Sequence, residues 1–465
     1  MKKLSNIYKV LLAICVTSLI SCEKFIEVDP PKGQTTKSIL FSNETTAISA
    51  MSNIYFLCAG NNFASGGANS ITRVAGMLAD EFDTYSTAQD LKDIYQNTIL
   101  PQNVIVNNIW QEAYHVIYQS NAIIEGLKQS TSLTESLKQQ LTGEALFMRA
   151  FSNFYLANIY GDVPYINSTD YRANTTAKRI AYRTVLNYVI DDLKQAKGLL
   201  HEDYPIDKTE RIRPNKWAAS ALLARVYLYQ QDWVNAELQA NEVLAKDGIY
   251  RLTPLADVFL KNSKEAIWQI KPVSNNTLNT HEGVSFILIG RPIAVYLKEG
   301  FSALFEVGDQ RKAAWVGNFT NADGSWDFPY KYKIRTGGVP FNEYSMVLRL
   351  AEQFLIRAEA RAKQNNLSGA IDDLDEIRHR AGLTKISVLN PNISKDDFLL
   401  VLEKERRMEL FSEWGHRWFD LKRTGRIDAV LKEVKPAWVS TAALFPIPAN
   451  ECLINVNMVQ NPGYN

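Results

Sequence analysis

The sequence predicts a mostly α-helical fold of repeated helical hairpins, with an irregular aromatic-rich insert and a few short strands. Long segments carry apolar residues at helical spacing, two of them repeat a helix–turn–helix plan, and the periodicity fades over residues 250–345. A chain of 465 residues can bury a large core within one domain. We therefore expect a single domain over residues 39–465.

The two repeated hairpins give the most specific fold signal. Each has a short polar turn, at residues 230–232 and 365–366, with small residues 12 positions apart on its two sides. These small residues are Ala224 with Ala236 and Ala358 with Ala370. Alanines at that separation let antiparallel helices approach closely, as in tetratricopeptide (TPR) hairpins. We expect TPR-like units over about 41–246 and 349–381.

Capping residues mark where several helices begin and end. Asp232 and Ser368 are placed to cap the second helix of each hairpin. Thr134 is placed to cap a long helix that Gly161 ends, with a proline close behind. Residues 181–200 have the pattern of a further amphipathic helix.

The insert at 250–345 is the expected ligand-binding part, because loops carry binding more often than regular elements do. Short strands are expected at 265–270 and 286–289. The apolar C–H face of a sugar packs on an aromatic ring while neighbouring polar side chains bind its hydroxyls. The rings selected as ligand contacts are Trp315, Trp326, Tyr296 and Tyr85. A core position is the alternative for each ring.

The first 21 residues have the order of a secretory signal: lysines, an apolar run, and a small residue before Cys22. The apolar run is far shorter than the roughly 20 residues that span a bilayer. A small residue directly before a cysteine resembles a bacterial lipobox, which is cut before the cysteine. We expect removal of residues 1–21, lipidation of Cys22 and an extended tether over 22–38. An ordinary signal peptide with an incidental cysteine is the alternative.

The charges do not favour a nucleic-acid partner. Lys and Arg number 51 and Asp and Glu number 50, which gives a formal net charge of +1. A nucleic-acid-binding domain is expected to carry a strongly basic face. No second long apolar run follows the first.

Two cysteines, Cys58 and Cys452, remain beyond the signal and Cys22. A disulfide between them is compatible with an oxidising compartment. Two free thiols are equally compatible with the sequence. Neither cysteine has histidines at metal-ligand spacing, so no zinc site is expected.

Glu405 and Glu409 are the best candidates for a catalytic carboxylate pair of the kind that a glycosidase needs. Arg406 and Arg407 lie between them and oppose the raised pKa that a general acid requires. We therefore expect a structural ion-pair network, with no catalytic residue and no cofactor.

Asp80, Glu81 and Asp83 form an acidic cluster in the sequence beside Tyr85. A calcium site and acceptors for sugar hydroxyls are two interpretations of this cluster. A solvated loop is the expected one, and no metal site is predicted.

Blocks across nearly the whole chain match one family. They are Cys22 with 25–31, then 149–151, 160–165, 218–228, 349–352, 358–360, 377–383, 405–410, 417–425, 445–448 and 460–464. In this order, after a lipobox, they resemble SusD/RagB proteins. The resemblance implies a SusD-like α–α superhelix, with 250–345 as the variable ligand-binding insert and 394–465 as a C-terminal framework.

The same resemblance implies a function. It describes a glycan-binding lipoprotein, anchored in the outer membrane through Cys22 and exposed at the cell surface. Such a protein captures an oligosaccharide and delivers it to a SusC-like TonB-dependent transporter, without catalysis. The same role for peptides or another nutrient, and a surface scaffold without a small ligand, are the alternatives.

Overall fold

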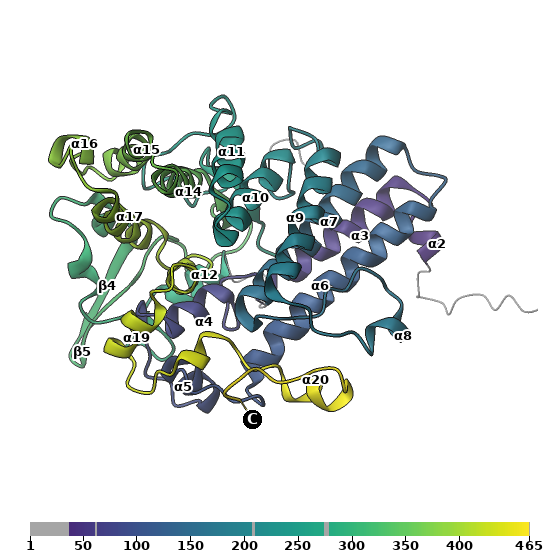
Figure 1. Cartoon of the computed structure of the whole chain (residues 1–465), viewed down its shortest axis with the longest axis horizontal. Coiled ribbons are helices and arrows are strands. Elements are labelled where there is room, and N and C mark those ends of the chain that lie inside the picture. The colour runs from purple at the N-terminus through teal and green to yellow at the C-terminus, as the bar shows by residue number, and fades with distance from the viewer. Residues whose placement is uncertain (1–36, 61–62, 207–209, 274–278, 465) are drawn as a thin grey trace, which may run out of the picture.

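A computed structural model of the chain describes residues 37–464 apart from 61–62, 207–209 and 274–278. The architecture is mostly α-helical, as expected, with a few short strands (Figure 1). The signal segment, Cys22 and the tether up to residue 36 lie outside the described residues. Within the described residues no helix is both long and apolar enough to cross a bilayer.

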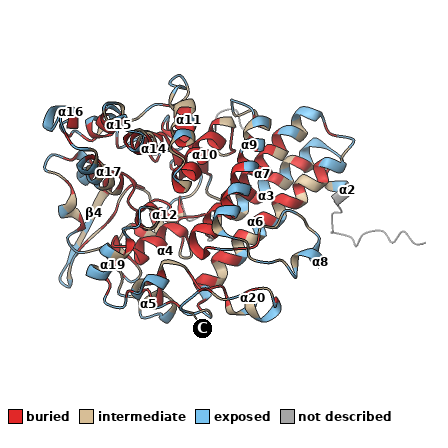
Figure 2. Ribbon diagram, viewed as in Figure 1, coloured by how far each residue is buried: buried red, intermediate tan, exposed pale blue. Residues whose placement is uncertain are grey.

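The N-terminal half is a bundle dominated by long helices. Its helices are α2 (Lys37–Leu40), α3 (Glu44–Ala59), α4 (Ile71–Leu78), α5 (Gln89–Gln96), α6 (Val104–Gln129), α7 (Glu135–Tyr160), α8 (Tyr171–Asn174), α9 (Tyr182–Leu199), α10 (Lys216–Gln230) and α11 (Trp233–Leu244). Helices α6, α7 and α9 lie side by side (Figure 1). Helices α6 and α9 have exposed outward faces (Figure 2), whereas α7 is buried on all sides from Gly143 to its end.

The C-terminal half combines shorter helices with most of the strands. Its helices are α12 (His281–Phe286), α13 (Gln310–Trp315), α14 (Leu350–Lys363), α15 (Leu367–Arg380), α16 (Ile386–Leu389), α17 (Lys395–Leu410), α18 (His416–Arg423), α19 (Ile427–Val434) and α20 (Ala449–Ile454), with 3-10 turns η2 (Phe301–Leu304) and η3 (Ser440–Ala443). The segment from α18 to the end of the described chain returns along the N-terminal bundle (Figure 1).

Three two-stranded antiparallel sheets complete the fold. They pair β1 (Phe82–Asp83) with β3 (Tyr296–Leu297), β2 (Ala266–Ile270) with β6 (Ser345–Arg349), and β4 (Val316–Asn321) with β5 (Gly324–Pro329). The strand expected at 265–270 is therefore confirmed as β2. The strand expected at 286–289 is wrong: Phe286 ends α12, whose first turn is capped by the Thr280 hydroxyl accepting from the Gly283 amide at 3.1 Å.

The two expected hairpins are α10–α11 and α14–α15. All four alanines of the sequence pattern are fully buried, so the small side chains do permit the close approach. Asp232 caps α11 by accepting from the Asn235 amide at 3.2 Å. The cap expected at Ser368 is wrong, because the N-cap is Asn366, two residues earlier, whose side chain accepts from the Gly369 amide at 3.1 Å.

The hairpins stack on one another although more than a hundred residues separate them in the sequence. Arg361 of α14 binds Glu237 of α11 at 2.9 Å, and Arg357 donates to the Asn241 side chain at 2.7 Å. On the other side, Thr134 and Gly161 flank α7 at the expected positions, but the Thr134 hydroxyl donates to Glu44 at 3.1 Å and makes no capping hydrogen bond. Gly161 has a positive φ of 76° that suits glycine. The result is a continuous helical body of repeated pairs.

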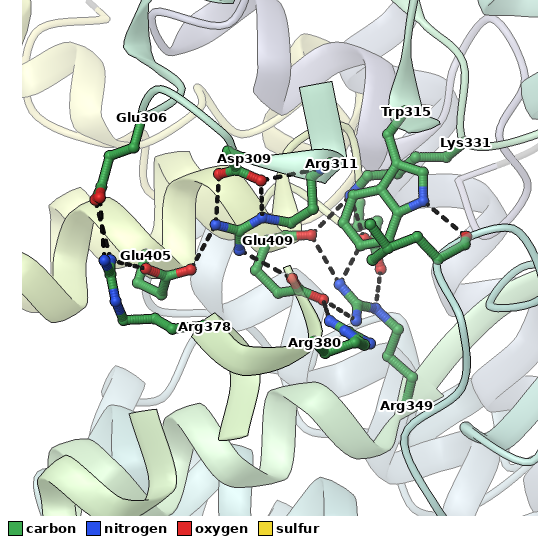
Figure 3. A network of polar contacts seen from close by, with 12 residues as sticks. Glu306, Asp309, Arg311, Trp315, Lys331, Arg349, Arg378, Arg380, Glu405 and Glu409 are labelled. Atoms are coloured by element: carbon green, nitrogen blue, oxygen red, sulfur yellow. Dashed lines mark hydrogen bonds and ion pairs between the residues drawn. The ribbon is translucent and has the colours of Figure 1, made fainter. Parts of the chain in front are cut away.

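Buried charges tie this body to the insert. They form a cluster whose members are Glu265, Asp309, Arg311, Lys331, Arg349, Arg378, Arg380, Glu405, Glu409 and Glu413, and the half-buried Glu306 joins it through Arg378 (Figure 3). Glu409 lies at its centre. Its carboxylate binds Arg311 at 3.1 Å and Arg349 at 2.6 Å, and it also binds Arg380. Burial alone would raise the pKa of Glu409, but the guanidinium groups around it hold that pKa well below its usual range.

Replacing Glu409 with glutamine should lower the free energy of unfolding by about 3–5 kcal/mol, because it leaves buried arginines without a counter-charge. Urea unfolding followed by circular dichroism measures this loss. The control is Glu237→Gln, which removes the partly exposed partner of Arg361 and should cost about 1 kcal/mol or less. Equal losses in the two variants would contradict the central position of Glu409.

Candidate functional site

One surface cavity gathers three of the four selected aromatic residues. It has a volume of about 390 Å³ and is lined by Tyr85, Tyr296 and Trp326 together with polar residues of the insert. That volume lies in the range of small-ligand sites, about 300–1,000 Å³. We call this cavity the Tyr85 pocket.

The three rings of the Tyr85 pocket come from three segments of the chain. Tyr296 lies in β3, Tyr85 follows β1, which pairs with β3, and Trp326 lies in β5, which packs beside β3. The Tyr85 and Tyr296 rings stack with centroids 5.1 Å apart and planes 18° apart. Trp326 meets Tyr85 edge-on at 6.5 Å, and its indole nitrogen donates to the Tyr85 hydroxyl at 3.3 Å. The rings therefore form a single cluster that is fixed by mutual contact.

Exposure differs among these rings. The Tyr85 side chain is 45% exposed, Tyr296 is half-buried, and Trp326 is 6% exposed. The Arg291 guanidinium lies 4.9 Å from the Tyr85 ring centroid. Tyr85 is thus the ring most open to a ligand, while Trp326 offers mainly an edge and holds Tyr85 in place.

The polar wall of the pocket is a row of hydrogen-bonded side chains on the β4–β5 hairpin. Asn318 donates to Ser325 at 3.0 Å and to Asp327 at 2.9 Å. Ser302 of the neighbouring 3-10 turn also donates to Asp327. These amide, hydroxyl and carboxylate groups match the donors and acceptors that sugar hydroxyls need.

The environment shifts the two tyrosine pKa values in opposite directions. The hydrogen bond from Trp326 lowers the pKa of the Tyr85 hydroxyl. Burial raises the pKa of Tyr296, with the Tyr85 hydroxyl and the Asp83 carboxylate adding to the rise. Asp83 itself accepts from the Tyr95 hydroxyl at 2.8 Å.

A tight turn builds the hairpin that carries this wall. Strands β4 and β5 pair in register from Val316–Pro329 to Asn321–Gly324, which leaves a two-residue loop. A Cβ on Gly324 would lie 2.9 Å from the Trp326 ring, so the glycine makes room for that ring. The Asp323-Gly324 pair within alternating residues signals a hairpin near this position, although the two loop residues are Ala322 and Asp323 and Gly324 already pairs in β5. That signal would have located Asn318, Ser325 and Asp327, which the sequence interpretation missed.

The structure corrects the selection of Trp315 as a ligand contact. Its side chain is fully buried, and its indole nitrogen donates to the Leu255 carbonyl at 3.0 Å. The Lys331 ammonium lies 4.7 Å from its ring centroid, next to the buried charge cluster (Figure 3). Trp315 ends α13 directly before β4 and turns inward there, so it supports the hairpin from below and presents no surface to solvent.

The acidic cluster beside Tyr85 is also not the solvated loop that was expected. Asp80 is buried and paired with Arg417 and Arg407 at 2.9 Å each. Glu81 is 2% exposed, and burial raises its pKa to about 7. Among the described residues no group of three or more His, Cys, Asp or Glu side chains could hold a metal ion.

The candidate catalytic pair is part of the buried charge cluster. Glu405 binds Arg311 at 2.6 Å and Arg378 at 3.1 Å, which confirms the expected structural network. Both glutamates are buried under side chains of the framework, away from the Tyr85 pocket. Cys58 and Cys452 are both free, so the disulfide alternative does not hold.

Comparison with known proteins places the chain in a family. A model described as starch-binding associating with outer membrane matches residues 24–228, and the SusD family model matches residues 321–464. The chain belongs to the SusD/RagB family.

Relatives and solved structures extend the likeness over the whole chain. SusD-like protein P25 of Formosa agariphila is 23% identical to this chain. The alignment covers 100% of this chain and 99% of that protein. A SusD superfamily crystal structure from Bacteroides vulgatus has a TM-score of 0.80 at 20% identity, covering 91% of this chain and 100% of its own. A structure named as a laminarin-binding SusD-like protein has a TM-score of 0.76 at 23% identity, and the match covers 91% of this chain and 100% of that protein. These structural likenesses establish the fold.

Replacing Trp315 with alanine should lower the free energy of unfolding by about 3–5 kcal/mol, because it opens a large cavity in a packed region. Tyr85→Ala, at an exposed ring, should change it by about 1 kcal/mol or less. Urea unfolding of both variants tests the distinction. If the two variants have the same free energy of unfolding, Trp315 is not a core residue and is again a candidate ligand contact.

Proposed function

We propose that this protein captures an oligosaccharide in the Tyr85 pocket and passes it to a SusC-like TonB-dependent transporter of the outer membrane. The observation that carries the proposal is the convergence of Tyr85, Tyr296 and Trp326 on one cavity beside a row of hydrogen-bonding side chains. An aromatic surface next to polar groups is the combination that sugar rings require.

The comparisons support the ligand class. One matching family model carries the description starch-binding, and one structure with the same fold is named as laminarin-binding. Starch and laminarin are both glucose polymers with uncharged rings. Three acidic residues line the pocket, Glu299, Asp323 and Asp327, against one lining cation, Lys298, and this balance favours neutral over anionic sugars.

The second part of the proposal concerns location and partner. The family model describes association with the outer membrane, and Cys22 follows a lipobox-like segment. Lipid chains on Cys22 hold the protein beside the transporter, which raises the effective concentration of captured ligand there. Modest affinity at the Tyr85 pocket then suffices for uptake.

Tyr85→Ala and Trp326→Ala should each weaken the binding of maltoheptaose or laminarin oligosaccharides by about tenfold or more, since each removes or releases part of the ring cluster. Isothermal titration calorimetry on the purified protein measures the change. The matched control is Tyr171→Ala, which removes a ring that is 69% exposed outside the pocket and should leave affinity unchanged. If both pocket variants bind these oligosaccharides as tightly as the wild type does, the Tyr85 pocket is not the binding site.

Cys22→Ser should move the protein from the outer-membrane fraction to the soluble fraction of the cell, because the lipid anchor can no longer form. Fractionation followed by immunoblotting measures the shift, with Cys452→Ser as the control that keeps the anchor. A Cys22→Ser protein that stays fully in the membrane fraction contradicts the anchoring.

A further inference from the structure

A second cavity lies between the C-terminal end of α7, the start of α9 and helix α18. Its volume is about 520 Å³, and it shares no lining residue with the Tyr85 pocket. We call it the Lys422 pocket. Two cationic side chains, Lys422 and Arg179, line it together with the rings of Tyr182 and Tyr229.

Lys422 lacks an anionic partner. Its ammonium donates to the Asn158 carbonyl in the last turn of α7, and no carboxylate among the described residues forms an ion pair with it. A helix C-terminus carries only about half an elementary charge. Burial without a counter-charge lowers the pKa of Lys422 to about 7. The neighbouring Arg423, by contrast, is fully paired with Glu359 and Asp420.

Arg179 is the second cation of this pocket, and no carboxylate of the described residues forms an ion pair with it, although Asp162 attracts it electrostatically. Its guanidinium donates to two backbone carbonyls, of Asp162 and Val459, and to the Asn461 side chain. These acceptors fix its orientation but do not neutralise it. The Asp162 carboxylate lines the same cavity and accepts from the Tyr182 amide at 2.8 Å.

The cavity is larger than a bare ion requires, and its other walls suit a sugar. A water molecule takes up about 30 Å³, far less than this cavity offers. The Tyr182 hydroxyl, which donates to the Asn158 side chain at 3.0 Å, can still accept a hydrogen bond beside the tyrosine rings. The Asn461 side chain is already bonded to Arg179 and to two backbone carbonyls, so it holds the wall of the cavity in place. A ligand of one or two rings with a single negative group fits both the volume and the charge.

We propose that the Lys422 pocket is a second binding site, which takes the carboxylate or sulfate group of an acidic saccharide between Lys422 and Arg179. The site is independent of neutral-glycan capture at the Tyr85 pocket. It gives one protein two ligand classes, neutral at one pocket and anionic at the other.

The test is calorimetric titration of the full chain with glucuronate, glucose 6-sulfate and glucose. The first two should bind at least tenfold more tightly than glucose, and their relative affinities distinguish carboxylate from sulfate as the preferred group. Lys422→Met should lose at least tenfold in affinity for the better anion, whereas Lys422→Arg, which keeps the charge, should retain it. Lys432→Met, at an exposed lysine of α19, is the control for general charge effects.

The pH dependence provides a second readout. The charged and titratable groups that face Lys422 across the cavity are Asp162, Arg179, Tyr182, Tyr229 and Arg423. Since only the protonated ammonium attracts the anion, affinity should fall as pH rises from 6 to 9, and the fall should vanish in Lys422→Arg.

Three results would overturn the proposal: equal anion affinity in wild type and Lys422→Met, glucose binding as tight as glucuronate binding, or the same loss in Lys422→Arg as in Lys422→Met. The last result would mean that Lys422 acts only as a helix cap. Because the two pockets share no residue, loss of laminarin binding in Trp326→Ala is a separate result, and either assignment can fail while the other stands.

Discussion

The buried charge cluster around Glu409 is the constraint on which the rest of this structure depends. It joins α17 to β6 through Arg349, to the second hairpin through Arg380, and to the insert through Arg311. Each ion has been removed from water at a large cost that is offset only while its partners stay in place. The helical body and the irregular insert therefore hold together as one unit, and the short β1–β3 pairing adds a regular backbone link between them.

The same cluster positions the candidate ligand site. The β4–β5 hairpin is flanked by Trp315 and Lys331, and the Tyr330 amide donates to the Trp315 carbonyl at 2.7 Å where β4 begins and β5 ends. Lys331 binds Glu413 and the Glu409 carbonyl below the hairpin. A rigid base of this kind lets an exposed loop keep its polar row in a fixed geometry, which lowers the entropy cost of ligand binding.

The two pockets differ in how their charges are satisfied. At the Tyr85 pocket the polar groups hydrogen-bond one another and the rings pack together, so the site is complete without a ligand charge. At the Lys422 pocket an ammonium packs against a helix end, and no carboxylate in the described part of the chain forms an ion pair with it. A neutral ligand suits the first arrangement and an anion suits the second, on electrostatic grounds alone.

By itself the sequence determined the helical class, the hairpins and the bounds of α7, because alanine spacing, caps and a left-handed glycine act through neighbours within a few turns. It also indicated Tyr85, Tyr296 and Trp326 as candidate ligand contacts. Only the tertiary structure decided that these three rings meet while Trp315 turns into the core. It alone showed Asp80 paired with Arg417, 337 residues away, and Lys422 bound to the Asn158 carbonyl at the end of α7. Such contacts depend on how distant segments pack, and local periodicity carries no information about that packing.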